Sequence, residues 1–212
     1  MSIPATYANA PTKRGFTLIE LMVSVAIFSI VMVMALGGLL SLSVADRKAA
    51  SLKSAIDNLS FGIDSMSRTI RTGQNYHCGS GGVDTTPQDC TVLNGGANYL
   101  TLLGPGTMGQ VYYQLDTSNA ATCGQTAGAV GCLERRLGAS GAWIPITSPD
   151  IIISSADSLG NPYTIFHVIG SPTGDNIQPQ VIITLNGVVQ VTPVQKTTFH
   201  LQTSVTQRIY DQ

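Results

Sequence analysis

The chain has 212 residues, of which 11% are charged, and its formal net charge is -1. This length predicts one globular domain with an appended segment rather than two independent cores. Because basic residues form no cluster and aromatic residues are few, the composition gives no indication of direct nucleic acid binding. The low charge, with abundant small polar residues, is typical of an extracytoplasmic, strand-rich protein.

A long apolar segment follows the polar N-terminus. No residue from Leu21 to Ala45 is charged, and about 20 apolar residues are enough for a helix to cross a bilayer core. A cleaved secretory signal has a shorter apolar core of roughly 7 to 15 residues. We therefore expect a membrane-spanning helix, with Gly37 and Gly38 as a flexible point.

Glu20 places a carboxylate at the start of this segment. A charge inside a spanning helix costs on the order of 2.5 to 3.5 kcal/mol and indicates a partner, for which an amine is the natural candidate. Cleavage between Gly15 and Phe16 would create an α-amino group one helical turn before Glu20. An amine from a neighbouring subunit would serve equally well.

Residues 13–27 read K-R-G-F-T-L-I-E-L-M-V-S-V-A-I, and this stretch resembles the N-terminal motif of the type IV pilin and pseudopilin superfamily. The resemblance implies a cytoplasmic leader, residues 1–15, which a prepilin peptidase removes by cutting after Gly15. It implies N-methylation of the new first residue, Phe16. It also implies that Glu20 aligns an incoming subunit with the terminus of its neighbour.

The resemblance further implies a set of partners and a location. The partners are other pilin or pseudopilin subunits, the prepilin peptidase, an inner-membrane assembly platform and, before assembly, membrane lipid. Basic residues near the apolar segment are Lys13 and Arg14 before it, and Arg47, Lys48 and Lys53 after it. This count alone favours an extracytoplasmic N-terminus. We give more weight to the cysteines, which need an oxidising side, and to the processing site, and predict a cytoplasmic N-terminus with an extracytoplasmic head.

The spanning helix is predicted to continue as an amphipathic helix over residues 46–72, so that residues 16–72 form one helix. Apolar residues recur every three or four positions at Leu52, Ile56, Leu59, Ile63, Met66 and Ile70. Charged residues occupy the other face at Lys53, Asp57, Asp64, Arg68 and Arg71. The apolar stripe predicts packing on a sheet of the same chain. Gly73 is predicted to end the helix as a C-terminal cap.

Residues 73–212, the head, are predicted to be rich in β-strands. The expected strands are Tyr99–Leu103, Val111–Leu115, Ile151–Ser154, Tyr163–Ile169, Val181–Leu185, Val188–Val191 and Phe199–Val205. Long loops are expected around the first two. Asn186-Gly187 between two β-branched runs predicts a two-residue hairpin turn. In the last strand, apolar and polar residues alternate from Phe199 to Thr206, so one face should be buried.

These elements predict an α+β fold, in which a long N-terminal helix packs on an antiparallel sheet. The pilin resemblance implies the same layout. Residues 201–208, L-Q-T-S-V-T-Q-R, also resemble the C-terminal strand of some minor pilins and J-type pseudopilins.

Four cysteines, Cys78, Cys90, Cys123 and Cys132, lie in the head. An even number in glycine-rich loops favours two disulfides and an oxidising compartment, although four reduced thiols are the alternative. Four cysteines allow three pairings. We favour Cys78 with Cys90 and Cys123 with Cys132, because short loops close most readily.

The sequence gives little indication of catalysis, and no cofactor is predicted. His77 adjoins Cys78, but the spacing of the cysteines does not match that of structural zinc sites, so no metal site is predicted. Oxygen ligands at Asp84 and Asp89, or at Asp175 near Asn176, would suit calcium, although solvated turns explain them equally. Tyr112, Tyr113 and Trp143 are interpreted as sheet packing rather than a ligand platform.

The predicted function is therefore that of a structural subunit, a minor pilin or pseudopilin of a type IV pilus or type II secretion-like filament. Its mechanism would be assembly rather than catalysis. The alternative is a single-pass membrane-anchored binding protein that retains residues 1–15 and never leaves the bilayer. A secreted hydrolase has no constellation of residues to support it.

Overall fold

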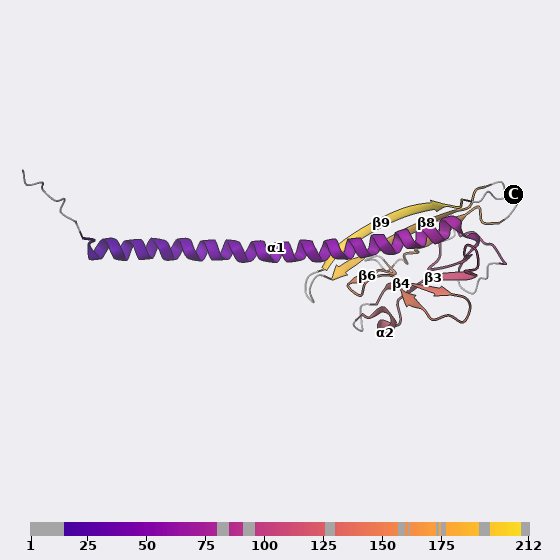
Figure 1. Cartoon of the computed structure of the whole chain (residues 1–212), viewed down its shortest axis with the longest axis horizontal. Helices are drawn as coiled ribbons and strands as arrows, with labels where there is room; N and C mark the ends of the chain where they lie inside the picture. The colour runs from indigo at the N-terminus through magenta and orange to yellow at the C-terminus, as the bar shows by residue number, and fades with distance from the viewer. Residues whose placement is uncertain are drawn as a thin grey trace, which may run out of the picture. The chain divides into compact units, whose positions relative to one another are not determined.

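The computed structural model describes residues 15–79, 85–90, 96–125, 130–156, 160, 162–172, 174, 177–190 and 196–208. The chain divides into two compact units, Met1–Arg47 and Lys48–Gln212. One continuous helix, α1 (Leu18–Thr72), contributes to both units (Figure 1). It begins two residues later than expected, and it runs through Gly37 and Gly38 without a break.

The C-terminal part of α1 belongs to the second unit and contributes to its core. Its buried residues are Ala55, Leu59, Gly62, Ile63, Met66 and Ile70. Burial of Leu59, Ile63, Met66 and Ile70 confirms the predicted amphipathic stripe. The prediction was wrong at Ile56, which is 44% exposed while Ala55 is buried. Neighbouring positions are about 100° apart around a helix, so once Leu59 and Ile63 face the core, Ala55 is the position in line with them.

α1 ends at Thr72, as expected, but Gly73 does not act as a left-handed cap. The positive backbone angle occurs two residues later, at Asn75 (φ 53). A Cβ atom on Gly73 would lie 2.5 Å from Cδ1 of Leu102 and 3.0 Å from the carbonyl oxygen of Leu103. Glycine is needed here because a strand approaches the chain closely, and not because of the helix-cap conformation.

The first sheet has five strands in the order β1-β2-β3-β4-β5, and all neighbours are antiparallel. The strands are β1 (Gln74–Cys78), β2 (Tyr99–Leu103), β3 (Gln110–Asp116), β4 (Cys132–Leu137) and β5 (Ile144–Pro145). A short helix, α2 (Ala120–Cys123), lies between β3 and β4. β2 and β3 confirm the two predicted strands. β1, β4 and α2 lie where loops were expected. The sequence of β4, C-L-E-R-R-L, contains three consecutive charged residues and therefore lacks the apolar alternation that signals a strand.

The second sheet consists of β6 (Ile151–Ile153), β7 (Phe166–Ile169), β8 (Gln180–Gln190) and β9 (Lys196–Thr206). β8 pairs antiparallel with each of the other three strands. β9 pairs with β8 along its whole length, and the two strands lie side by side in Figure 1. The predicted alternation in β9 is confirmed: Val205 is buried, Phe199, Leu201 and Thr203 are half-buried, and the residues between them are exposed.

The predicted hairpin at Asn186-Gly187 was wrong, because β8 continues through both residues. Asn186 pairs with His200, and Gly187 pairs with Phe199. A Cβ atom on Gly187 would lie 2.4 Å from the carbonyl oxygen of Ile152 and 3.0 Å from the ring of Phe199. Gly187 therefore allows close packing inside the sheet, and the two predicted strands around it form one strand.

Isolated backbone bridges join the segment between β1 and β2 to β7 of the second sheet. Cys90 pairs with Val168, and Ala97 pairs with Phe166. A single hydrophobic core includes residues of α1 and of both sheets, among them Met66, Leu100 and Ile183. The antiparallel sheets, together with the long apolar N-terminal helix, confirm the predicted α+β fold.

Candidate functional site

The residues expected to act in processing and assembly lie within the first unit. Gly15, Phe16 and Thr17 precede α1, and Phe16 is 84% exposed. A Cβ atom on Gly15 would meet no atom within 4 Å. Glu20 is exposed and lies in the first turn of α1. The peptide bond between Gly15 and Phe16 thus lies just before the helix, and the carboxylate lies just inside it.

Thr17 is the first residue of a helix-capping pattern. Its Oγ1 atom accepts a hydrogen bond from the backbone N–H of Glu20 at 3.3 Å. Thr-x-x-Glu is the sequence signature of a capping box, and a carboxylate in a first turn also interacts favourably with the helix dipole. Glu20 therefore has a second role that the Thr-x-x-Glu pattern indicates, local stabilisation of the helix start, which was not among the sequence predictions.

Large apolar side chains cover the helix from Leu18 to Val44 and are exposed. The most apolar 18-residue window has a mean hydropathy of 2.5, and none of that window is buried. Length and composition alone make α1 a candidate to cross a membrane, although a signal sequence near an N-terminus has the same properties. In aqueous solution this surface would be unfavourable, so it requires lipid or other apolar helices around it.

The cysteines lie in the second unit and form the two pairs favoured by their spacing. Cys78 bonds to Cys90, and Cys123 bonds to Cys132, each with a Cα–Cα distance of 5.6 Å. Cys78 and Cys90 are therefore not available to a zinc ion beside His77. Both carboxylate oxygens of Asp89 accept hydrogen bonds from backbone amides, of Gly170 at 2.9 Å and of Ser171 at 2.7 Å. The other proposed calcium ligands, Asp84, Asp175 and Asn176, lie outside the described residues.

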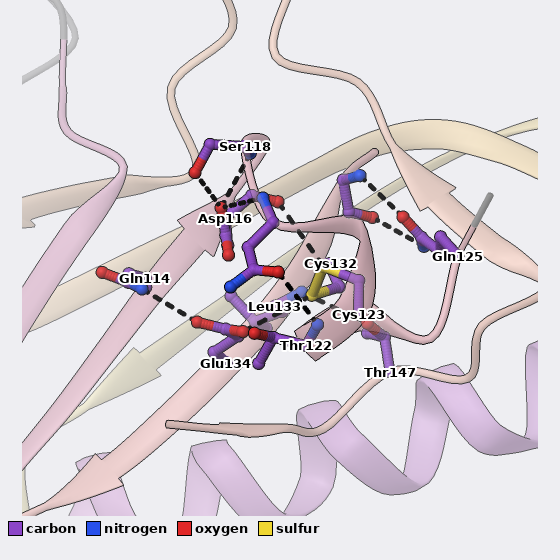
Figure 2. The surroundings of a disulfide bond; sticks show 12 residues. Gln114, Asp116, Ser118, Thr122, Cys123, Gln125, Cys132, Leu133, Glu134 and Thr147 are labelled. Atoms are coloured by element: carbon purple, nitrogen blue, oxygen red, sulfur yellow. Dashed lines mark hydrogen bonds between the residues drawn. A yellow bond between two sulfur atoms is a disulfide. The ribbon is translucent and has the colours of Figure 1, made fainter. Parts of the chain in front are cut away.

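The second disulfide lies beside a group of polar side chains on one face of the first sheet (Figure 2). Asp116 pairs with Cys132 across β3 and β4, and Gln114 pairs with Glu134. Because side chains two apart on a strand point to the same side, these four share one face. Nε2 of Gln114 donates to Oε2 of Glu134 at 2.8 Å. Oε1 of Glu134 lies 3.9 Å from Sγ of Cys132.

Glu134 is a buried acid, with only 1% of its surface exposed. Burial raises the pKa of its carboxyl group above the ordinary value, the hydrogen bond from Gln114 acts in the opposite direction, and the charge of Asp116 raises the pKa further. Glu134 forms no ion pair within the part of the chain that the structure describes. No sequence pattern identified it, because a single acid beside two arginines in a strand suggests an exposed face.

Asp116 and Gln125 hold the chain on either side of α2. Oδ1 of Asp116 accepts hydrogen bonds from the backbone N–H and the hydroxyl of Ser118, both at 2.8 Å. Burial acts to raise the pKa of Asp116, but its hydrogen bonds with Ser118 and Asn119 outweigh burial and the net shift is downward. The side chain of Gln125 accepts from the N–H of Gly131 and donates to the carbonyl of Ile151.

The histidines form no cluster in the described structure. His77 hydrogen-bonds with Thr86, and the exposed His200 with Asn186. His167 is buried, and its Nδ1 atom has no hydrogen-bond partner among the described residues. Burial lowers the pKa of His167. Among the aromatic residues, Arg136 lies over the rings of Tyr112 and Trp143, at 4.3 and 4.6 Å from their centroids, which supports their interpretation as sheet packing.

Comparison with protein families gives one match. Residues 11–44 match the model of the prokaryotic N-terminal methylation motif. These residues include Gly15, Phe16, Glu20 and most of the exposed apolar helix. Searches of curated proteins and of solved structures found no significant match. The match therefore supports a protein that is anchored in a membrane by its N-terminal segment. It does not extend to the head.

Proposed function

We propose that this protein is a structural subunit, a minor pilin or pseudopilin, of a type IV pilus or type II secretion-like filament. The premise is that its N-terminal segment is of the type found in type IV pilins and pseudopilins. The observation that carries this proposal is the match of residues 11–44 to the methylation motif, on a helix whose apolar surface is exposed. The role is assembly and not catalysis.

The proposed pathway begins with a precursor in the inner membrane, with residues 1–15 in the cytoplasm and the head outside. The prepilin peptidase cuts after Gly15, and Phe16 becomes the methylated terminus. An assembly platform then moves the helix from lipid into a bundle of similar helices, where Glu20 pairs with the terminal amine of a neighbour. The two disulfides in the head support the assignment of the head to an oxidising compartment.

The experiment that tests this function is intact-mass analysis and N-terminal sequencing of the membrane-extracted chain, expressed with and without a prepilin peptidase. We expect a chain beginning at methylated Phe16 only when the peptidase is present. A Gly15→Val variant is the matched control, because the site has open space for a side chain; it should insert normally and stay unprocessed. A wild-type chain that still begins near Met1 in the presence of the peptidase would favour the anchored binding protein, and a start near Asp46 would identify the apolar segment as a cleaved leader.

A further inference from the structure

We infer that Glu134 is the proton acceptor for Cys132 when the Cys123–Cys132 disulfide closes, so that this cross-link carries its own general base. This inference concerns the head and does not depend on the function proposed above.

The first argument is the position of the carboxylate relative to sulfur. Oε1 of Glu134 lies 3.9 Å from Sγ of Cys132, in the same strand and on the same face of the sheet. This separation falls within the range of a sulfur-containing hydrogen bond, so a Cys132 thiol would donate its proton to the carboxylate. Oε2 is held by Gln114, which leaves Oε1 directed at the sulfur (Figure 2).

The second argument is that the closed disulfide leaves this oxygen without a donor. A disulfide sulfur carries no hydrogen, so in the structure Oε1 accepts no hydrogen bond from any described residue. A buried polar atom without a partner is destabilising. The same atom has a partner in the reduced chain, namely the thiol of Cys132. The position of the Glu134 carboxylate therefore suits the reduced chain, in which Cys132 has a proton to donate, better than it suits the closed disulfide.

The chemistry requires a base because the thiolate, and not the thiol, attacks a disulfide. Closure by an external disulfide first gives a mixed disulfide at Cys123. Sγ of Cys132 then bonds to Sγ of Cys123, the bond from Cys123 to the external sulfur breaks, and that sulfur leaves as a thiolate with the electron pair. The proton of Cys132 passes to Glu134, which becomes a neutral acid. The cysteines are oxidised, and the external disulfide is reduced.

The surroundings favour a neutral acid as product. The titratable groups described on this face are Asp116, Cys123, Cys132 and Arg136. The guanidinium group of Arg136 lies over the rings of Tyr112 and Trp143, and it forms no ion pair with Glu134 in the described structure. Burial and the negative charge of Asp116 both raise the pKa of Glu134, which brings the proton affinity of the carboxylate closer to that of the thiol. General bases work best when their pKa lies near the working pH.

The first disulfide provides an internal control. Cys78 and Cys90 lie near the carbonyl oxygen of Phe166, at 3.8 and 3.5 Å from the two sulfur atoms. The nearby carboxylate of Asp89 is occupied by the amides of Gly170 and Ser171. A carbonyl oxygen does not take up a proton near neutral pH, so among the described residues no carboxylate is placed at this pair as Glu134 is at Cys132.

The test uses the full-length chain in detergent micelles, reduced with a phosphine and then oxidised with glutathione disulfide. Alkylation at successive times followed by peptide mass mapping gives the closure rates of both disulfides in the same molecules. In Glu134→Gln, which keeps an acceptor for Gln114, we expect closure of Cys123–Cys132 near neutral pH to slow by at least roughly tenfold, while closure of Cys78–Cys90 is unchanged. Asp116→Asn is the matched control for loss of a nearby negative charge, and it should slow closure much less.

The pH profile separates a base from a merely structural residue. As pH rises above the pKa of the thiol, roughly 8.5, Cys132 ionises without help. The ratio of wild-type to Glu134→Gln rates should then fall to one or below, because an ionised carboxylate disfavours a thiolate beside it. Equal rates in wild type and Glu134→Gln near neutral pH, or a ratio independent of pH, would overturn the inference.

A second measurement starts from the folded, oxidised chain and so does not depend on the fold of the reduced one. By microscopic reversibility, protonated Glu134 returns the proton to Cys132 as it leaves during reduction by dithiothreitol. Glu134→Gln should therefore also slow opening of this disulfide, most strongly at acidic pH. Unchanged opening rates would contradict the assignment even if the reduced variant were unfolded.

Discussion

The hydroxyl group of Tyr76 donates a hydrogen bond to the carbonyl oxygen of Ile70 at 2.7 Å, with the carbonyl oxygen of Gly73 3.1 Å away. Tyr76 lies in β1, and Ile70 lies in the last turn of α1. The last carbonyls of a helix lack their usual partners within the helix. Here the carbonyl oxygen of Ile70 accepts from the N–H of Gly73 at 3.0 Å as well as from the buried hydroxyl of Tyr76. This contact fixes the point at which the long helix changes into the sheet.

We predict that Tyr76→Phe destabilises the head by about 0.5–1.5 kcal/mol, because the variant removes a buried hydrogen bond, while the carbonyl oxygen of Ile70 keeps its bond from the N–H of Gly73. Tyr163→Phe is the control, since the half-buried Tyr163 hydroxyl has no hydrogen bond with the described residues and its loss should change little. Urea denaturation in micelles, followed by the fluorescence of the single tryptophan, Trp143, measures both. Equal midpoints for Tyr76→Phe and wild type would show that the contact is not stabilising.

Gly187→Ala is predicted to destabilise the second sheet. The new methyl group would lie 2.4 Å from the carbonyl oxygen of Ile152, so β6 and β8 would have to separate locally. Overpacking of this kind costs about 1–3 kcal/mol. Asn186→Thr changes the preceding position, which is only half-buried, and should be tolerated. A Gly187→Ala variant as stable as wild type would argue against the close approach of the two strands.

His167 is predicted to make the head sensitive to mild acid. Burial lowers its pKa in the folded chain, so below about 6.5, the ordinary value, the unfolded chain binds a proton that the folded chain does not. The stability contributed by neutral His167 is therefore complete above that value and is lost as pH falls below it. His167→Gln should reduce the difference between denaturation midpoints measured at about pH 7.5 and about pH 5. An unchanged difference would assign the acid sensitivity to other groups.

Two roles of Glu20 are distinguishable by mutation. Under the assembly proposal, Glu20→Ala should insert into the membrane as well as or slightly better than wild type, because the carboxylate is costly there. Its incorporation into sheared filaments should fall at least about tenfold, which corresponds to about 1.4 kcal/mol of lost pairing energy. Immunoblots of filament and membrane fractions give this ratio.

Thr17→Ala is the matched control for Glu20→Ala. It removes the hydroxyl that accepts from the N–H of Glu20 but keeps the carboxylate. We expect Thr17→Ala to assemble nearly normally. If both variants lose incorporation to the same extent, the role of Glu20 is to start the helix, and the pairing with a neighbour's amine is wrong.

Features that depend on neighbouring residues could be predicted from the amino-acid sequence. The N-terminal motif follows from consecutive residues, the long apolar helix from an unbroken uncharged run, and the alternation in β9 from a repeat of two residues. The end of the helix at Thr72 was predicted correctly, although Gly73 is not the left-handed cap that was the reason given for it. The disulfide pairing was favoured by short loop closure. Even the Thr17 capping pattern was present, although it was overlooked.

Features that depend on residues far apart in the chain could not be predicted in this way. Asn186-Gly187 has the local chemistry of a turn, but pairing with β9 and the approach of Ile152 make it the middle of a strand. Ile56 fits the helical stripe by spacing, yet the sheet covers Ala55 instead. Glu134 became a candidate base only because β3 and α2 bury it beside Cys132. In each case local propensity was outweighed by contacts between segments far apart in the chain, which no local pattern records.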